Sequence, residues 1–571
     1  MHDIQNIITE RVDDIPLLLE HMQRMELPTL IDTHFPAHGH WYGLSLGWVS
    51  IIWLSSILSR GDHRLVHVEP WMANRLFTLQ TVTGQAVERL DFTDDRLESI
   101  LRHLSDDTRW GQFESSLNQH TVRVYDLSTE RIHVDSTTAS AYASVSPEGL
   151  FQFGHSKDYR PDLPQVKVMQ AVLDPLGMPL ATDVVSGERA DDPLYGPCIE
   201  RVQQSLGRSG LLFVGDCKMA AHATRAFIAL AGDYYLCPLP QVQLAEGELE
   251  AALERMWSGD QALHSVLREP EQAEPTLIAQ GYEYEVPMSV AVEGKPRQWG
   301  ERRLVVRSIR HAEAAEAALR ARVAKAKAQV ESLNLRGRGR RRFEEVEPLR
   351  QAVYDMVQGH RVEDFLWLRY DQHTTTRRVR AYREWPAYEE QQATVEVRVD
   401  EEALESAVHR LGWRIYSTNQ PVEQLSLEQA VLAYRSEYLV ERSLGRLKGR
   451  PLSLTPMYVQ RDDHATGLIR LLSIALRVLT LVEFVVRHQL AAEGATLAGL
   501  YAGNTKRETA RPTAERLLEA FQEVTLTVVE GIHPAYRHLT TLSPLQERSL
   551  ELLGFSSRVY TRLCTVSHEP L

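Results

Sequence analysis

The sequence predicts an α/β protein: a mixed sheet with helices, interrupted by an inserted β-rich domain and flanked by a helical N-terminal domain and a helical C-terminal tail. Three observations indicate this fold class. Apolar residues recur at helical spacing in the first 125 residues, and short strand-like runs then alternate with helices. The composition shifts repeatedly through a long central block, after which a strand and long helices return. The predicted domain boundaries are 1–125, 126–240, 241–410, 411–495 and 496–571.

The composition is that of a globular protein. Of the 571 residues, 43% are hydrophobic and 25% are charged, which excludes general disorder. At roughly 150 residues per domain, this length suggests about three or four domains. The four cysteines form no C-x-x-C pair, which excludes a disulfide scaffold and a cysteine-rich zinc module and favours a reducing compartment.

No segment is typical of a membrane span. The N-terminus is acidic and lacks the apolar core of a signal peptide. The apolar run Leu44–Leu58 is too short to cross a bilayer, and Thr466–Val486 contains three charged residues, so both are expected to be buried helices. We therefore expect a soluble, cytoplasmic protein without a membrane partner.

The core of the predicted sheet begins near residue 130. Three strands come first, and two more follow, with a helix before each of them. This order predicts a mixed sheet, and the apolar run before Asp216 predicts that its strand is central. The expected strands are Arg131–Asp135, Gln165–Asp174, Leu180–Ser186, Leu211–Asp216 and Tyr234–Leu239, and the expected helices are Pro193–Leu206 and Ala220–Ala231.

The inserted block combines strand-like segments with a basic helix. Tyr282–Val306 and Thr374–Asp400 show strand-like alternation, and the Ala-, Arg- and Lys-rich segment His311–Asn334 predicts a helix that ends in the basic turn Arg336–Arg342. Residues 302–342 contain thirteen Lys and Arg against three acids, whereas the chain as a whole has a net charge of −14. The total argues against indiscriminate nucleic-acid binding, but we expect this basic run to face phosphates.

After the insertion the chain is predicted to return to the sheet. Gly412–Thr418 is an expected strand, and the capping-box pair Ser426 and Gln429 opens a helix. We expect this helix to continue through Glu441 until Gly449-Arg450-Pro451 ends it. A second long, buried helix and a mainly helical tail are expected at Arg461–Leu490 and Leu500–Leu571.

Three acids are the candidate catalytic residues. Asp135 and Asp216 each follow an apolar strand, and acids at the ends of neighbouring strands can converge at one edge of a sheet. Glu441 lies between Tyr434 and Lys448 at spacings of seven, so the three share a helical stripe. Simpler alternatives exist: Asp135 could cap the following turn, and the stripe could be a solvated helix surface.

Two aspartates and a glutamate form a hard oxygen site that suits Mg²⁺ or Mn²⁺. We therefore expect Asp135, Asp216 and Glu441 to be both the metal ligands and the catalytic residues. Two ions held in this way can clamp the attacking and leaving oxygens of a phosphodiester during an in-line displacement. Water or a DNA 3′-hydroxyl would be the nucleophile. Other possible ligands are expected to be structural, with Cys217 packed as a small apolar residue and His34, His38 and His40 in a polar loop.

These features together resemble the DDE transposases of bacterial insertion sequences, whose catalytic core is ribonuclease-H-like. Their signature is an aspartate after each of two strands, followed by a helix with the motif Y-x-x-R-x-x-x-E-x-x-x-x-x-x-K. Tyr434, Glu441 and Lys448 occupy matching positions, but Glu437 stands at the arginine position, and Arg435 or Arg442 could replace that charge. The segments GHSKDYRPDLPQVKV, RDDHATGLIRLLSIALRVLT and KRETARPTAERLL also resemble one branch of this family, as does a β-rich insertion between the second aspartate and the glutamate.

The resemblance implies an enzyme that cuts double-stranded DNA at the ends of its mobile element and joins the 3′ ends to a target. Such an enzyme would act as a homodimer or larger assembly on DNA, associated with the bacterial nucleoid, with two Mg²⁺ or Mn²⁺ ions. The helical N-terminal domain could bind the DNA ends through Arg60, Arg64 and Arg75. An inserted-domain tryptophan, Trp367 or Trp385, could stack on an unpaired base. The expected DNA-binding residues are Tyr434, Arg435, Lys448, Lys157, Arg160, Arg336, Arg338 and Arg340, with His155 beside them.

Two alternatives remain open at this point. A ribonuclease-H-like nuclease that cuts DNA without joining it would use the same three carboxylates. A transposase-derived DNA-binding protein without catalytic activity would explain Glu437 at the arginine position and the acidic net charge. The intact set of Asp135, Asp216 and Glu441 speaks against this second alternative.

Overall fold

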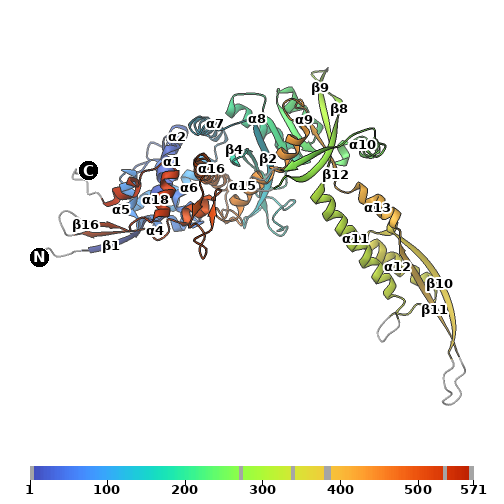
Figure 1. The fold of residues 1–571 in the computed structure, drawn as a ribbon. Helices are drawn as coiled ribbons and strands as arrows, with labels where there is room; N and C mark the ends of the chain where they lie inside the picture. Colours follow the sequence, from blue (N-terminus) through green and yellow to red (C-terminus); the bar gives the residue numbers. More distant parts are fainter. Residues whose placement is uncertain (1–5, 269–273, 336–340, 378–387, 531–535, 565–571) are drawn as a thin grey trace, which may run out of the picture. The chain divides into compact units, whose positions relative to one another are not determined.

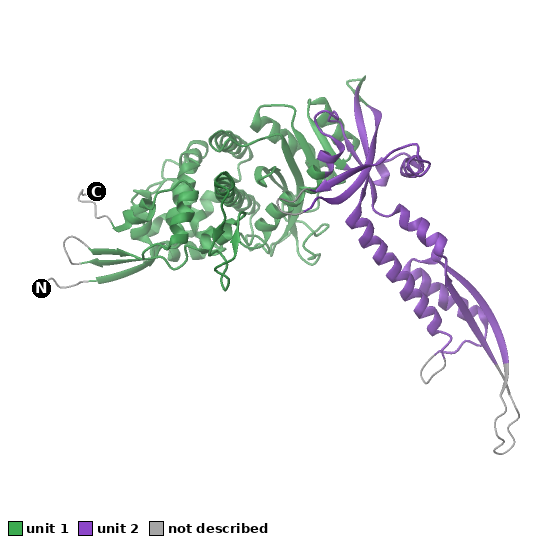
Figure 2. Cartoon of the chain, viewed as in Figure 1, with its two compact units in different colours: residues 1–237, 289–297, 432–571 green, residues 238–288, 298–431 purple. Residues whose placement is uncertain are grey.

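The computed structural model describes residues 6–268, 274–335, 341–377, 388–530 and 536–564 (Figure 1). The chain forms two compact units (Figure 2). Unit 1 comprises residues 1–237, 289–297 and 432–571, and unit 2 comprises residues 238–288 and 298–431. Strands and helices mix within both units, so the α/β class is confirmed, while the five-part division remains a prediction.

Five strands of unit 1 follow one another in the order β4-β3-β2-β5-β6. Strand β3 is antiparallel to β2 and β4, whereas β5 is parallel to β2 and β6. Every residue of β3 is buried, as expected for a strand that is covered on both faces. All five were predicted, and their bounds are β2 Arg131–Ser140, β3 Gln165–Leu173, β4 Met178–Ser186, β5 Leu212–Gly215 and β6 Tyr234–Pro238.

Strand β2 differs from the prediction, because it continues five residues beyond Asp135, to Ser140. Strand β3 pairs with this extension as far as the pair Ser140 and Gln165. Strand β5 ends earlier, with Gly215 opposite Val134. Asp135 therefore lies within β2, and the last residues of this strand have no β5 partner beside them.

The N-terminal region is largely helical, as predicted. The apolar run that begins at Leu44 lies mostly within a buried helix, which starts where the Ser45 side chain accepts a hydrogen bond from the Trp48 amide. Two short 3₁₀ turns, Leu65–His67 and Arg89–Phe92, interrupt the series. The helices are α1 Ile15–Arg24, α2 Leu27–His34, α3 Leu46–Arg60, α4 Val68–Ala73, α5 Leu76–Thr83, α6 Asp94–Leu104 and α7 Asp107–Val124.

Helix α16, Asp462–Glu493, is the long buried helix that the sequence predicted. It packs against α6, β4 and α3. Its Gly467 lies against the backbone of α6, where an added Cβ would be 2.1 Å from the Leu101 carbonyl oxygen, so only glycine permits this approach. The three charged residues within its apolar run, Arg470, Arg477 and Glu483, are ion-paired, as when Arg477 contacts Glu114 at 2.7 Å.

The N-terminal and C-terminal regions share a sheet that the sequence analysis did not predict. Strand β1, Asn6–Arg11, pairs with β15, Thr525–Glu530, which also pairs with β16, Tyr536–Leu539. A short pair, β13 Leu497–Ala498 and β14 Glu508–Thr509, adds further strands to the tail. The expectation of a mainly helical tail was therefore incomplete. Its helices are α17 Ala514–Glu519, α18 Pro544–Leu552 and α19 Arg558–Thr561, followed by a 3₁₀ turn at Arg562–Cys564.

Four further strands follow the order β12-β9-β8-β7, and their residues belong to unit 2 except for 289–297, which are assigned to unit 1. Their bounds are β7 His264–Arg268, β8 Thr276–Val292, β9 Lys295–Ser308 and β12 Trp413–Thr418, with helix α10 Glu248–Trp257 nearby in sequence. The remainder of the unit has its own apolar core, which includes Leu319, Val353 and Val395. This part consists of α11 Ile309–Ser332, α12 Val346–His360, β10 Leu366–Arg377, β11 Tyr388–Val399 and α13 Glu401–Arg410. The inserted block is thus as helical as it is β-rich.

The helix expected to run through Glu441 without interruption is instead two helices, α14 Leu427–Arg435 and α15 Tyr438–Lys448. The predicted capping box is present, because the Ser426 amide donates to the Gln429 side chain at 2.9 Å and the Gln429 amide donates to the Ser426 hydroxyl at 3.2 Å. At the junction the Glu437 amide bonds to the Tyr434 carbonyl, three residues back, rather than four. The Ser436 hydroxyl donates to the Leu432 carbonyl at 3.3 Å, a contact that bends helices.

Among the described helices, none combines the length and the apolar character that crossing a membrane requires.

Candidate active site

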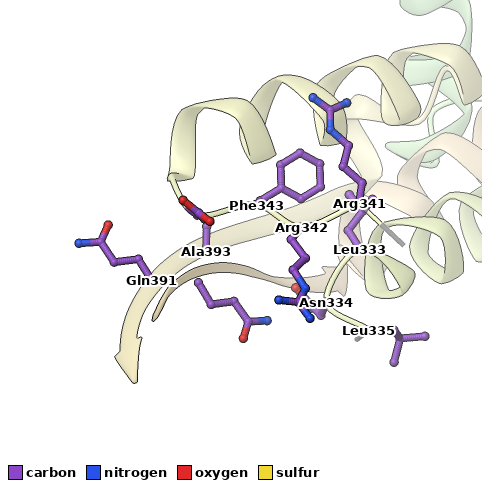
Figure 3. A pocket seen from close by; sticks show the side chains of 10 residues that line it. Leu333, Asn334, Leu335, Arg341, Arg342, Phe343, Gln391 and Ala393 are labelled. Carbon is purple, nitrogen blue, oxygen red and sulfur yellow. The ribbon is translucent and has the colours of Figure 1, made fainter. Parts of the chain in front are cut away.

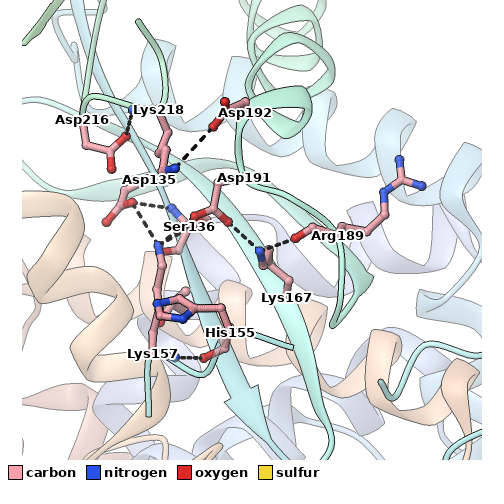
Figure 4. Close-up of polar contacts among 12 residues, drawn as sticks. Asp135, Ser136, His155, Lys157, Lys167, Arg189, Asp191, Asp192, Asp216 and Lys218 are labelled. Carbon is pink, nitrogen blue, oxygen red and sulfur yellow. Dashed lines mark hydrogen bonds and ion pairs between the residues drawn. The ribbon is translucent and has the colours of Figure 1, made fainter. Parts of the chain in front are cut away.

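Asp135 and Asp216 lie at neighbouring positions of two parallel strands. Val134 of β2 is in register with Gly215 of β5, and the two aspartates are the next residue along each chain (Figure 4). Each carboxylate also bonds locally, since the Ser136 amide donates to Asp135 at 2.6 Å and the Lys218 amide donates to Asp216 at 2.8 Å. The Asp135 carboxylate accepts the Ser136 amide, but no turn follows it, because β2 continues to Ser140; the turn-capping alternative is therefore corrected.

Helix α15 covers the sheet face that carries Asp135. Gln170 is the cross-strand partner of Asp135, and side chains of such partners lie on one face. The Ser443 hydroxyl of α15 donates to the Gln170 side chain at 2.7 Å. Val440 and Leu444 pack on Val172, two residues further along β3 on the same face.

The far end of α15 is held at the same strand. Lys448 donates to the Thr137 hydroxyl at 3.0 Å and forms an ion pair with Asp158. Thr137 is two residues beyond Asp135 and therefore points to the same face. Glu441 and Lys448, seven residues apart within α15, share one side of the helix as predicted, but Tyr434 lies in α14, beyond the break.

Glu437, the residue at the arginine position of the family motif, is partly buried and directly precedes α15. Burial and the nearby charges of Asp135 and Asp216 raise its pKa to about 7, although a hydrogen bond with Tyr434 opposes the shift. Glu441, one turn further on, is exposed. The structure therefore brings a fourth carboxylate toward the two aspartates, which the sequence analysis treated only as a departure from the motif.

Asp135 also has a raised pKa, of about 6. Burial is the main cause, the ammonium of Lys157 lowers the pKa in part, and the charges of Asp216 and Asp191 raise it further. The Lys157 Nζ lies 3.8 Å from the Asp135 carboxylate and 3.6 Å from Asp191, and it donates to the Ser136 carbonyl at 2.7 Å. Lys157, predicted as a DNA contact, thus lies directly beside the aspartate pair.

The segment that opens helix α8, Tyr195–Leu206, supplies two residues that the sequence analysis missed, Asp191 and Tyr195. Asp191 receives an ion pair from Lys167 at 2.7 Å as well as the contact with Lys157 (Figure 4). The Tyr195 hydroxyl donates to the Asp216 carboxylate at 2.6 Å. The pKa of Tyr195 is well above its usual value, mainly because the residue is buried and secondly because of the negative charge of Asp216. The signal available in the sequence was Asp-Asp-Pro, which indicates the start of a helix but not which residues these acids contact.

The chemistry of these side chains suits a divalent cation, because carboxylates crowded at one sheet edge repel each other until a cation neutralises them. Their arrangement does not yet form a site: in the described ranges, no group of three or more His, Cys, Asp or Glu residues is disposed to hold a metal ion. Asp135 and Asp216 are adjacent, and the helical glutamates would have to complete the set.

The other predicted DNA contacts differ in exposure and in pairing, and some of them lie outside the described residues. Arg160 forms an ion pair with Asp162 at 2.8 Å, and His155 is exposed in the loop that also carries Lys157. Arg435 is exposed at the end of α14, while Arg442 contacts Glu483 at 2.7 Å and is not available to replace the motif arginine. Arg336, Arg338, Arg340 and Trp385 lie outside the described residues.

The basic run of residues 302–342 does not form a single surface. Arg302 and Arg303 are buried, and Arg302 donates to the Leu425 carbonyl at 2.8 Å. Arg320 pairs with Glu316 and Glu405. Arg341 and Arg342 are exposed and, with Phe343, border a cavity of about 30 Å³, room for one water molecule and far too small for a base (Figure 3). The expectation that the whole run faces phosphates is therefore corrected for its buried arginines.

Three further expectations have mixed outcomes. Cys217 is exposed, so its expected packing as a small apolar residue was wrong. Trp367 is 48% exposed, with the Arg398 guanidinium 5.6 Å from its ring centre, and remains open to stacking. Two of the N-terminal arginines gather around one ring, with Arg75 4.8 Å and Arg60 5.9 Å from the Trp71 centroid, whereas Arg64 pairs with Asp62.

No protein-family model matches the chain, and no curated protein matches it. A solved structure of a piggyBac transposase synaptic complex with hairpin DNA is similar to it, with a TM-score of 0.36 and 7% sequence identity. That similarity covers 97% of this chain and 86% of the transposase chain. A TM-score of this size does not establish a common fold.

Proposed function

We propose that the chain is a DDE transposase that cuts the ends of its own DNA element and joins the 3′ ends to target DNA. The observation that carries the proposal is the placement of Asp135 and Asp216 side by side on parallel strands, under a helix that carries Glu441. The strand order β4-β3-β2-β5-β6, with an antiparallel first half and a parallel second half, supports a ribonuclease-H-like core. Double-stranded DNA and a second copy of the chain are the proposed partners.

Within this proposal, Asp135, Asp216 and Glu441 would hold Mg²⁺ or Mn²⁺, and the metal would supply activation of the attacking hydroxyl and stabilisation of the leaving oxygen. Side chains of the protein itself would bind the DNA for that chemistry. Lys157 lies 3.8 Å from the Asp135 carboxylate, and Lys448 donates to Thr137, two residues further along β2, so both would offer positive charge to a phosphate. Since Lys448 is also paired with Asp158, DNA would have to compete with that carboxylate for it.

The test compares Glu441→Gln with Glu437→Gln, which each replace one carboxyl group with an amide at positions four residues apart. DNA that carries the flanking sequence of the gene is incubated with the protein and Mg²⁺ or Mn²⁺. We expect cleavage at a defined end for the unmodified protein, a loss of at least about 100-fold in Glu441→Gln, and a smaller loss in Glu437→Gln. Joined products identify a transposase, and cut products without joining identify a nuclease. The reverse order of the two losses would make Glu437 the third catalytic acid.

A second candidate function is a DNA-binding protein without catalytic activity. The observation in its favour is that the described residues form no three-ligand metal group. Specific binding to the flanking DNA by the unmodified protein and by Glu441→Gln alike, with no cleavage by either, would establish it.

A further inference from the structure

We propose that Tyr195 is a positioning residue that fixes the carboxylate of Asp216 for metal binding. Resting on the proposed function, this inference adds a residue that the catalytic motif does not contain. Its hydroxyl donates to the Asp216 Oδ1 atom at 2.6 Å. The Tyr195 side chain is 1% exposed, so the hydrogen bond is shielded from water.

The two donors to Asp216 share one oxygen. The Tyr195 hydroxyl and the Lys218 amide both bond to Oδ1, at 2.6 and 2.8 Å. In the part of the chain that the structure describes, no hydrogen bond to Oδ2 is found. Two donors on one oxygen restrict the rotation of the carboxylate, and the second oxygen is left for a ligand. This is the arrangement in which outer-shell hydrogen bonds orient a metal-binding carboxylate.

The position of Tyr195 is itself well determined. It is the first residue of α8, which packs on β3 and β4 and on α7. Four residues earlier, Asp191 contacts Lys157, which lies beside Asp135. The segment 191–195 therefore reaches both aspartates, Asp216 directly and Asp135 through a lysine. A tyrosine hydroxyl held by a packed helix costs little entropy to place, so it can set the geometry of a carboxylate that follows a strand end.

The experiment compares Tyr195→Phe with Tyr560→Phe in the full-length protein. Tyr560 is a matched control, because its hydroxyl is also buried and donates to a carbonyl, that of Asp13, at 2.9 Å. Mn²⁺ binding is measured directly, by electron paramagnetic resonance of the free ion, and cleavage of the flanking DNA is measured as a function of Mg²⁺ concentration. Thermal unfolding of both variants reports the general cost of losing a buried hydroxyl.

We expect Tyr195→Phe to weaken Mn²⁺ binding by about 10- to 100-fold and to raise the Mg²⁺ concentration for half-maximal cleavage, with an unchanged KM for DNA. Tyr560→Phe should lower the unfolding temperature without either effect. In the Asp216→Asn background, Tyr195→Phe should have no further effect on Mn²⁺ binding, since the two act as one unit. If Tyr195→Phe fails to fold, 3-fluorotyrosine at position 195 keeps the ring and changes only the donor, and Mn²⁺ affinity must still shift.

The failures are distinguishable. If the unmodified protein binds Mn²⁺ and cuts DNA but Tyr195→Phe matches Tyr560→Phe in both assays, the positioning role is wrong and the proposed function stands. If the unmodified protein neither binds Mn²⁺ nor cuts DNA, the proposed function is wrong and this inference falls with it.

Discussion

Two groups of acids in unit 1 have different surroundings: Glu483 is buried among arginines, whereas Asp135 and Glu437 are partly buried near other acids. Glu483 of α16 is surrounded by cations, with Arg442 and Arg446 at 2.7 and 2.6 Å and Arg487 one turn away. Burial alone would raise the pKa of Glu483, but the hydrogen bond from Arg442 and the neighbouring arginine charges hold it below its usual value.

The acids at the sheet edge have no such neutralisation. The pKa of Asp135 is raised to about 6 and that of Glu437 to about 7, in both cases by burial first and by other acids second. Lys157 is the cation that lowers the pKa of Asp135 most. A fold can satisfy a buried carboxylate when it supplies arginines, as it does at Glu483. Crowded carboxylates with few cations beside them are the surroundings that the proposed cation site requires.

The largest effect on stability should come from removing the charge of Glu483, the acid that is neutralised by arginines. Glu483→Gln leaves three arginines around a neutral side chain, so we expect the free energy of unfolding to fall by about 3–5 kcal/mol. Chemical denaturation monitored by circular dichroism measures this. Glu515→Gln is the control, because Glu515 also contacts Arg446 but is 35% exposed, and it should cost about 1 kcal/mol or less. Equal losses in the two variants would contradict the distinction drawn here.

Removing the charge of Asp135, which lies near other acids, should instead increase the free energy of unfolding. A pKa near 6 in the folded protein against the ordinary 3.8 means that Asp135 costs stability as pH rises from about 4 to about 6, and that the full cost persists above pH 6. Asp135→Asn should therefore stabilise the protein by about 1–3 kcal/mol at pH 8 and by little at pH 4. Denaturation curves at the two pH values test this. A stabilisation that is the same at both would show that charge is not the cause.

A divalent cation should relieve the same repulsion. We expect Mg²⁺ or Mn²⁺ to raise the unfolding temperature by a few degrees at pH 8 and by much less at pH 5, where Asp135 and Glu437 bind protons instead. Differential scanning fluorimetry with and without the ion is the measurement, and Asp135→Asn with Asp216→Asn is the control. A rise that persists in this double variant would place the ion elsewhere.

The smallest effect concerns the hydrogen bond that fixes α15 over Asp135. Ser443→Ala removes the donor to Gln170 and leaves a buried oxygen without it, at a cost of about 1 kcal/mol. Ser549→Ala is the control, because the Ser549 hydroxyl donates to the Leu545 carbonyl of its own helix. If Ser443 helps to position the helical glutamates, its variant should also cut DNA more slowly than the control does.

The sequence by itself determined the elements whose signals are local. The apolar runs and their spacing gave the five strands of unit 1 and the buried helix α16, because burial on one or both faces leaves a periodic trace in the chain. The placement of Asp135 and Asp216 beside each other was expected from the apolar run that precedes each of them, although Asp135 proved to lie within its strand. The capping box at Ser426 was predicted because all its atoms lie within four residues.

The tertiary structure alone decided which residues meet across long distances. Strand β1 pairs with β15 more than 500 residues later, and Tyr195 meets Asp216 through the packing of a helix on a sheet. The break at Ser436, which separates Tyr434 from the stripe of Glu441 and Lys448, accompanies the burial of Glu437 near the aspartates. Whether an acid is neutralised like Glu483 or left crowded like Asp135 depends on which charges surround it, and sequence periodicity carries no information about those neighbours.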